Sequence, residues 1–166
     1  MLISGTGRRS INIKGFTLLE MLIVIAIIAI VLLIAAPNFT RYLHNTNLKT
    51  AGRDLAGDIY NYKQNAAAQS VHYKIIFNKD ENTYKILKGG PEGTDSYDDA
   101  SAIVKNIGSD ASYIRIDDVS YNNDQVIIQP RGTTLGGNVT LVNDIGSNIT
   151  IITSLMGKVS VKYNAK

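Results

Sequence analysis

The chain has 166 residues, with 17 Lys or Arg, 14 Asp or Glu, two His and no cysteine. The lack of cysteine excludes disulfide bonds and thiolate chemistry, and His44 and His72 lie on separate predicted elements with no nucleophile beside either. No enzyme activity, cofactor or metal site is therefore predicted. Arg8, Arg9 and Lys14 precede residue 16, and the other 14 basic residues equal the 14 acids, which argues against a general nucleic-acid-binding protein.

Residues 1–15 are predicted to be a basic leader. They contain Arg8, Arg9 and Lys14 and no acidic residue. Positive charge ahead of an apolar segment keeps that end of the chain in the cytoplasm. The rest of the protein is therefore expected on the other side of a membrane.

Residues 16–36 are predicted to form a membrane-spanning helix. Every residue in this range except Thr17 and Glu20 is apolar, and a helix of about 20 such residues spans a hydrocarbon core of about 30 Å. The Glu20 carboxylate costs about 2.5–3.5 kcal/mol there, so a partner is expected, and it need not belong to the same chain. A plain signal anchor remains an alternative, as does a secretory signal cleaved near Ala35-Ala36-Pro37.

The junction Gly15-Phe16-Thr17-Leu18-Leu19-Glu20 resembles the N-terminus of the type IV pilin superfamily, which includes pilins, minor pilins and the pseudopilins of type II secretion. The resemblance implies that a prepilin peptidase cleaves after Gly15 and methylates the new N-terminus at Phe16. It also implies that Glu20 pairs with the N-terminal amine of a neighbouring subunit during assembly. Such a buried pair can fix the register between subunits.

The same resemblance implies the partners and the location of the protein. The partners are the prepilin peptidase, an inner-membrane assembly platform and other pilin or pseudopilin subunits. Before assembly the protein is expected as a single-pass inner-membrane protein with its globular domain outside the cytoplasm. After assembly it is expected in a pilus or a periplasmic pseudopilus.

Residues 37–70 are predicted to be the amphipathic second half of the same helix. Pro37 removes a backbone donor and predicts a kink. Farther along, apolar and small residues recur at helical spacing and form one face that should pack on a globular domain: Leu48, Gly52, Leu55, Ile59, Tyr62 and Ala66.

Residues 71–166 are predicted to be a β-rich globular domain. Short β-prone segments separated by Gly and Asn turns indicate an antiparallel meander. Residues 88–112 are predicted to be a surface loop with a short helical turn over 100–106. The fold class is therefore α+β: a pilin fold with a long N-terminal helix packed on a C-terminal antiparallel β-sheet domain. The predicted strands are Val71–Phe77, Thr83–Leu87, Tyr113–Val119, Gln125–Gln129, Val139–Val142, Ile149–Thr153 and Val159–Tyr163.

The order of these segments resembles that of the pseudopilin H and FimT/FimU group of minor pilins. The resemblance rests on the strand ending Ile127–Thr133, on Val139-Thr140-Leu141 and on the final Gly157-Lys158-Val159-Ser160-Val161. It implies a position near the filament tip, in a complex that primes assembly.

Some FimT-type members bind DNA through a glycine and arginines near the C-terminal strands. Here Lys158 stands in place of the first arginine and Ser160 in place of the second. The candidate DNA contacts are Arg131, Lys158 and Lys162, and the even spacing of the two lysines would place them on one face of a strand. Solvation of an open sheet face is the alternative reading.

Two acidic pairs could offer oxygen ligands to calcium. They are Asp98-Asp99 and Asp117-Asp118, and neither has the spacing of an EF-hand loop. A solvated loop explains them equally well, so no metal site is assigned.

Three functions remain open. The first is a structural minor pilin or pseudopilin of a type IV pilus or type II secretion filament, acting in initiation or at the tip. The second is a major pilin that forms the fibre itself. The third is a DNA-binding minor pilin in DNA uptake.

Overall fold

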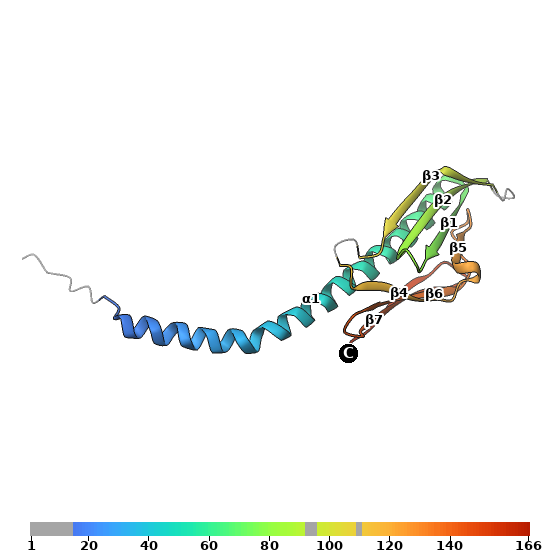
Figure 1. Cartoon of the computed structure of the whole chain (residues 1–166). Coiled ribbons are helices and arrows are strands. Elements are labelled where there is room, and N and C mark those ends of the chain that lie inside the picture. Colours follow the sequence, from blue (N-terminus) through green and yellow to red (C-terminus); the bar gives the residue numbers. More distant parts are fainter. Residues whose placement is uncertain (1–14, 92–95, 109–110) are drawn as a thin grey trace, which may run out of the picture. The chain divides into compact units, whose positions relative to one another are not determined.

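The computed structural model describes residues 15–91, 96–108 and 111–166. The predicted leader, with Arg8, Arg9 and Lys14, lies outside the described residues apart from Gly15. The chain divides into two compact units, Met1–Phe39 and Thr40–Lys166. One helix, α1 (Leu18–Gln69), begins in the first unit and ends in the second (Figure 1).

The first unit contains the apolar half of α1. All described side chains from Gly15 to Phe39 are exposed. The most apolar 18-residue window of α1 has a mean hydropathy of 3.2, and the helix is long and apolar enough to cross a membrane. Pro37 lies inside the helix, and the Asn38 side chain donates a hydrogen bond to the Ile34 carbonyl over 3.3 Å.

The second half of α1 buries one face in the globular unit, as the periodicity predicts. Tyr62 is half-buried, and its ring lies 5.1 Å from that of Tyr73. The helix ends at Gln69, and Ser70 follows with a positive φ of 53°. The buried residues of this face are Leu48, Ala51, Gly52, Leu55, Ala56, Ile59 and Ala66.

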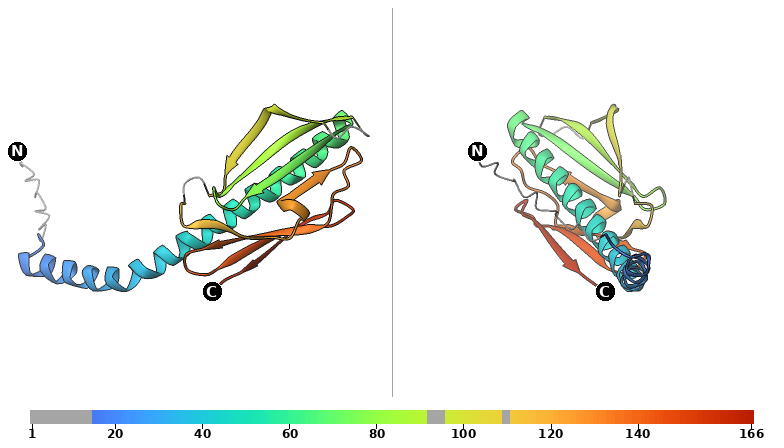
Figure 2. Two further views of the ribbon diagram at one scale, coloured as in Figure 1. Left: turned by 45° about the vertical axis from the view of Figure 1, so that its right-hand side comes forward. Right: turned by 90° about the vertical axis from the view of Figure 1, so that its left-hand side faces the viewer.

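The strands of the globular unit form two four-stranded antiparallel sheets rather than one meander (Figure 2). Sheet A has the order β3-β2-β1-β5, and sheet B has the order β4-β6-β7-β8. The prediction of a single meander is wrong because β5 pairs with β1 and leaves β4 to pair with β6. A short 3-10 helix, Asn122–Asp124, makes this change of sheet between β4 and β5.

The predicted strand positions agree closely with those in the structure. The bounds in sheet A are β1 (Val71–Asn78), β2 (Thr83–Pro91), β3 (Tyr97–Asn106) and β5 (Gln125–Ile128). Those in sheet B are β4 (Ile114–Val119), β6 (Gly137–Asn143), β7 (Asn148–Thr153) and β8 (Val159–Asn164).

β3 is the strand that the sequence does not predict. It occupies positions 100–106, where a helical turn is expected, so that prediction is wrong. Both faces of β3 are largely exposed, and its sequence therefore lacks the alternation of apolar and polar residues that marks a half-buried strand. Its ladder with β2 and an ion pair between Asp99 and Lys85 hold it in place.

The core lies between the buried face of α1 and the inner faces of both sheets. In β1, β5, β6 and β7 alternate residues point inward, as in β7, where Ile149 and Ile151 are buried. The close contact of Gly52 with Ile149 brings α1 onto sheet B, because a side chain at Gly52 would meet the Ile149 Cδ1 atom at 2.5 Å. Both sheets therefore depend on the second half of α1 for their core.

Candidate functional site

The N-terminal segment consists of three non-helical residues followed by a capped helix. Residues 15–17 precede α1, and Phe16 is 74% exposed. The Thr17 hydroxyl accepts a hydrogen bond from the Glu20 backbone N–H over 3.1 Å. This is the arrangement of an N-cap, and Thr-x-x-Glu is the sequence pattern of a capping box. The junction after Gly15 is therefore exposed and outside the helix.

Glu20 lies in the first turn of α1, where the helix dipole favours a negative charge. That effect is worth only about 0.3–1 kcal/mol at an exposed position, less than the cost of placing a carboxylate in a bilayer. Residues 16–39 contain no Lys, Arg or His. No side chain of residues 16–39 can therefore serve as a cationic partner for Glu20.

The structure brings two of the candidate DNA residues onto loops that touch each other. Arg131 lies in the loop between β5 and β6, and Lys158 ends the turn between β7 and β8. The Gly157 Cα packs directly on the Gly132 carbonyl, so any side chain at Gly157 would overlap that oxygen. Gly157 also has a φ of +72°, which favours glycine, and the two loops therefore meet only because residue 157 has no side chain.

Lys162 lies on β8, away from this loop contact, and pairs with Thr150. The ladder between β7 and β8 extends one step to Lys158, whose carbonyl accepts a hydrogen bond from the Ser154 N–H over 3.0 Å. Lys158 and Lys162 are therefore on one regular extended segment at even spacing. Lys63 of α1 reaches the same region, because its Cε atom would lie 3.0 Å from a side chain at Gly157.

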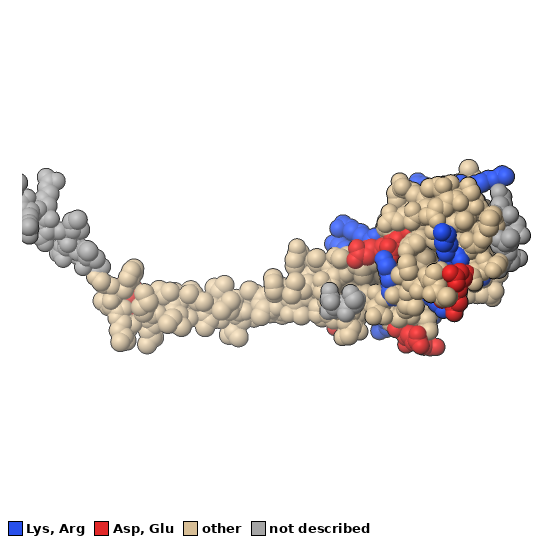
Figure 3. All heavy atoms as spheres, turned by 90° about the horizontal axis from the view of Figure 1, so that it is seen from above, with Lys and Arg blue, Asp and Glu red and all other residues tan. Residues whose placement is uncertain are grey.

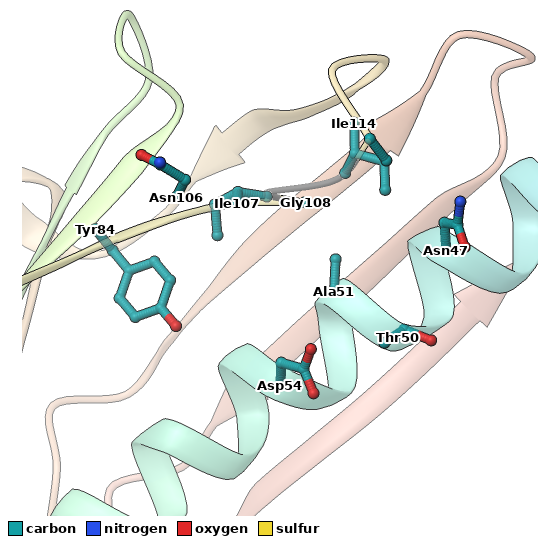
Figure 4. A pocket seen from close by; sticks show the side chains of 10 residues that line it. Asn47, Thr50, Ala51, Asp54, Tyr84, Asn106, Ile107, Gly108 and Ile114 are labelled. Carbon is teal, nitrogen blue, oxygen red and sulfur yellow. The ribbon is translucent and has the colours of Figure 1, made fainter.

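A hollow beside α1 is lined in part by Tyr84, an ionisable group whose pKa is raised. The hollow has a volume of about 150 Å³ and lies between α1 and the segment that follows β3. Figure 4 shows Asp54 and the Tyr84 hydroxyl directed into it. Tyr84 donates a hydrogen bond to Asp58 over 2.5 Å, and Lys105 pairs with the same carboxylate at 2.7 Å. Burial, and then the bond to Asp58, raises the pKa of Tyr84.

These contacts join α1 to sheet A. The phenol stays protonated because its pKa is raised, and the Asp58 carboxylate is shared by two donors. The network was not apparent from the sequence, since Asp58 and Tyr84 lie 26 positions apart. Only the amphipathic spacing of α1 could have placed Asp58 at the edge of its buried face.

Both histidines make structural contacts. The His44 Nδ1 atom lies 2.8 Å from Asp144, and its ring stacks on Tyr113 with centroids 3.9 Å apart. His72 contacts Gln129 at 2.9 Å and the Gly90 carbonyl at 3.3 Å. Across residues 15–91, 96–108 and 111–166, no group of three His, Cys, Asp or Glu side chains could hold a metal ion.

The acidic pairs also have structural surroundings. Asp98 accepts a hydrogen bond from the Ala100 N–H over 3.0 Å, while Asp99 pairs with Lys85. Asp117 and Asp118 lie at a register shift in β4 and are exposed.

Comparison with known proteins identifies the N-terminal segment. A family model described as the prokaryotic N-terminal methylation motif matches residues 11–36. Competence protein ComGC of Bacillus subtilis is 56% identical over 41 residues, and the ComG operon protein 3 homolog of Bacillus licheniformis is 51% identical over 41 residues. Each match covers 25% of this chain and 40% of the relative's own length.

A solved structure identifies the fold. The minor pseudopilin EpsH from the type 2 secretion system of Vibrio cholerae superimposes with a TM-score of 0.58 at 7% identity. The match covers 72% of this chain and 99% of EpsH. At this identity the likeness concerns the fold alone, and it is the fold predicted from the order of the elements.

Together the motif and the fold are those of a type IV pilin-type subunit. The chain resembles the type IV pilin superfamily, and its fold is similar to that of the minor pseudopilin EpsH. The predicted resemblance to the superfamily is therefore confirmed by a motif match over residues 11–36 and by a match of the fold over 72% of the chain.

Proposed function

We propose that this chain is a minor subunit of a type IV pilus or type II secretion filament, which acts in initiation or at the tip and assembles through its N-terminal helix. The observation that carries the proposal is the apolar half of α1, which is exposed throughout and begins with a capped turn containing Glu20. An all-round apolar helix needs lipid or other helices as its surroundings. A filament subunit uses both in turn, the bilayer before assembly and the filament core afterwards.

The proposal divides the chain into four parts. Residues 1–15 are the leader removed by the prepilin peptidase, which then methylates Phe16. Residues 16–36 are the membrane and filament-core helix, 37–70 the amphipathic half, and 71–166 the globular domain. The globular domain lies outside the cytoplasm, and the assembly platform extracts the subunit from the inner membrane.

Glu20 is proposed to be the assembly residue. Its partner is the N-terminal amine of Phe16 on a neighbouring subunit, because residues 16–39 supply no cationic side chain. Pairing converts two charges that are costly in an apolar core into one neutral pair.

The test is to isolate sheared surface filaments and quantify the chain by mass spectrometry together with its N-terminus. The expected result is a chain that begins with N-methyl-Phe16 and is present at trace level beside a more abundant pilin. Dominance of the filament would make the chain a major pilin instead. An N-terminus other than Phe16 would overturn the processing site, and absence from pili with correct processing would favour a secretion pseudopilus.

A second candidate function, DNA uptake, is supported by the contact between the loops that carry Arg131 and Lys158. In this reading Arg131, Lys158 and Lys162 contact phosphates. Retention of the purified chain on duplex DNA should then fall steeply with salt, and Arg131→Ala should reduce the slope of that fall by about one. Salt-independent retention, or none, would remove this candidate.

A further inference from the structure

Two sheets with open ends give the globular unit four edge strands, namely β3 and β5 in sheet A and β4 and β8 in sheet B. An edge strand presents unpaired N–H and C=O groups and can accept a strand from another chain. Proteins usually close or distort such edges. The four edges of this unit differ in whether they are closed.

The edge of β4 is closed by one side chain. The Asn82 amide nitrogen donates to the Ile114 carbonyl over 2.7 Å, and its oxygen accepts from the Ile116 N–H over 2.9 Å. Asn82 therefore occupies the positions at which a neighbouring strand would bond to β4.

The edge of β5 is closed by the chain that follows it. The Leu135 N–H donates to the Ile127 carbonyl over 3.4 Å, and the Gln129 N–H donates to the Thr133 carbonyl over 2.8 Å. A β-bridge between Ile128 and Thr134 lies between these bonds.

The edge of β3 is interrupted. Its pairing with β2 passes from Ile86↔Ile103 to Lys88↔Asp98, so residues 99–102 bulge out opposite a single residue of β2. A bulge bends the strand and ends the flat ladder that a further strand needs.

The edge of β8 is open and regular. All six of its residues pair with β7 without a register shift, and the described residues provide no strand or side chain that bonds to its other edge. In an antiparallel ladder every second residue of a strand bonds to its neighbour. Because the Ser154 N–H donates to the Lys158 carbonyl, the residues of β8 that bond to β7 are the even-numbered ones. The N–H and C=O groups of Val159, Val161 and Tyr163 therefore point away from β7, and Val161 is 41% exposed.

Lysines surround this open edge. Lys158 and Lys162 lie on or beside β8, and two lysines of α1 approach its ends: the Lys49 Nζ atom lies 4.3 Å from the Tyr163 ring, and Lys63 reaches Gly157. Lys49 and Lys63 are 14 residues apart, which is about 21 Å along the helix axis. This length is close to the length of strand from Gly157 to Tyr163, which is about 20 Å. Residues 145–166 contain no Asp or Glu. The edge is thus flanked by positive charge along the length of one strand.

We propose that the β8 edge accepts an extended, acidic segment of a different filament subunit as an added strand. The backbone groups of Val159, Val161 and Tyr163 provide the ladder, and the four lysines select for acidic side chains. The choice of a filament subunit as the partner rests on the proposed function. Pairing of β8 with β8 of a second copy is disfavoured because it would bring the lysines of both copies together, and the other edges of a second copy are closed or bulged.

The direct test uses the full chain in detergent micelles and two labelled probe peptides, one alternating Asp with Val and the other alternating Lys with Val. Fluorescence anisotropy is expected to show binding of the Asp peptide and none of the Lys peptide. Val161→Pro removes an N–H that points away from β7 and leaves the β7 ladder intact, so it should weaken binding at least about tenfold. Val161→Ala, the matched control, keeps the N–H and should change affinity by less than about threefold.

A second pair of variants keeps the test decisive if Val161→Pro unfolds, which tyrosine fluorescence would reveal. Lys158→Glu combined with Lys162→Glu should reverse the preference from the Asp peptide to the Lys peptide. Equal binding of both peptides, or undiminished binding by a folded Val161→Pro chain, would overturn the proposal. Binding of duplex DNA with no binding of either peptide would overturn it in favour of phosphate recognition.

In cells, the expected result for Val161→Pro is normal cleavage to N-methyl-Phe16 with loss from filaments. Failure of cleavage in the wild-type chain would count against the proposed function and not against the β8 edge. Normal incorporation of Val161→Pro would count against the edge alone.

Discussion

The two halves of α1 belong to one helix but have opposite surroundings. Residues 18–39 expose every side chain, whereas the residues from Leu48 to Ala66 bury seven in the globular unit. On the face drawn in Figure 3, charged side chains gather on the globular unit and are almost lacking on the apolar half. A helix that is apolar on all sides needs surroundings that the rest of its own chain does not supply. A helix with one apolar face, by contrast, packs that face on the core of its own chain.

Replacement of Gly15 by Trp should have the largest effect, because it should block the proposed cleavage, which precedes assembly into a filament. Gly15 has open space around it, so the substitution leaves the structure of α1 unchanged. Only full-length precursor is expected on an immunoblot of membranes. Ser10→Trp, within the same leader, is the control and should be processed normally; cleavage of the Gly15 variant would refute the assigned site.

Glu20→Ala should separate membrane insertion from assembly. Insertion and cleavage are expected to be unchanged or improved because a buried carboxylate is removed, while incorporation into filaments should fall at least about tenfold, since a buried charge left without its partner costs about 3–5 kcal/mol. The measurement is the ratio of the protein in sheared filaments to that in membranes. Thr17→Ala, which removes only the cap, is the control, and equal losses for both variants would point to the cap instead of the charge.

The same substitution in the two halves should have unequal effects on the globular fold. Leu55→Ala removes a fully buried side chain and should lower the free energy of unfolding by about 2–5 kcal/mol. Leu33→Ala, in the exposed half, should change it by less than about 0.5 kcal/mol. Urea unfolding of the full chain in micelles, followed by tyrosine fluorescence, measures both. Similar losses would mean that the apolar half also supports the globular fold.

A smaller effect should distinguish two glycines within the second half of α1. Gly52→Ala places a methyl group against Ile149 and should destabilise the unit by about 1–3 kcal/mol. Gly57→Ala meets nothing within 4 Å and should stabilise it by up to about 1 kcal/mol through helix propensity. The same urea titration compares the two, and effects of the same sign would contradict the packing of α1 on β7.

The sequence predicts the helix and most strands because their burial is periodic. Leu48, Leu55 and Ile59 recur at helical spacing, and the strand from Ile149 to Thr153 alternates as a half-buried strand must. β3 was missed because its exposure on both faces leaves no alternation to detect. The division into two sheets was missed because pairing between β5 and β1 is a long-range contact that local patterns do not encode.

The candidate sites also differ in whether local sequence or long-range contacts define them. Gly15, Phe16 and Glu20 form one contiguous motif, so their roles could be proposed from the sequence and stay proposals in the structure. The contact of Gly132 with Gly157 and the open edge of β8 depend on which loops and strands meet in space. Spacing predicts Lys158 and Lys162 on one extended segment, but it cannot predict that Lys49 and Lys63 approach the same strand.

Closure of β4 by Asn82 helps to limit how many strands the subunit can accept from other chains. A subunit with only one open edge can accept a single added strand. It has no second open edge at which a third chain could be added. Growth of the sheets therefore stops at a pair and does not run into a fibril. Asn82, the segment after β5 and the bulge in β3 together leave open-ended polymerisation to the helices alone.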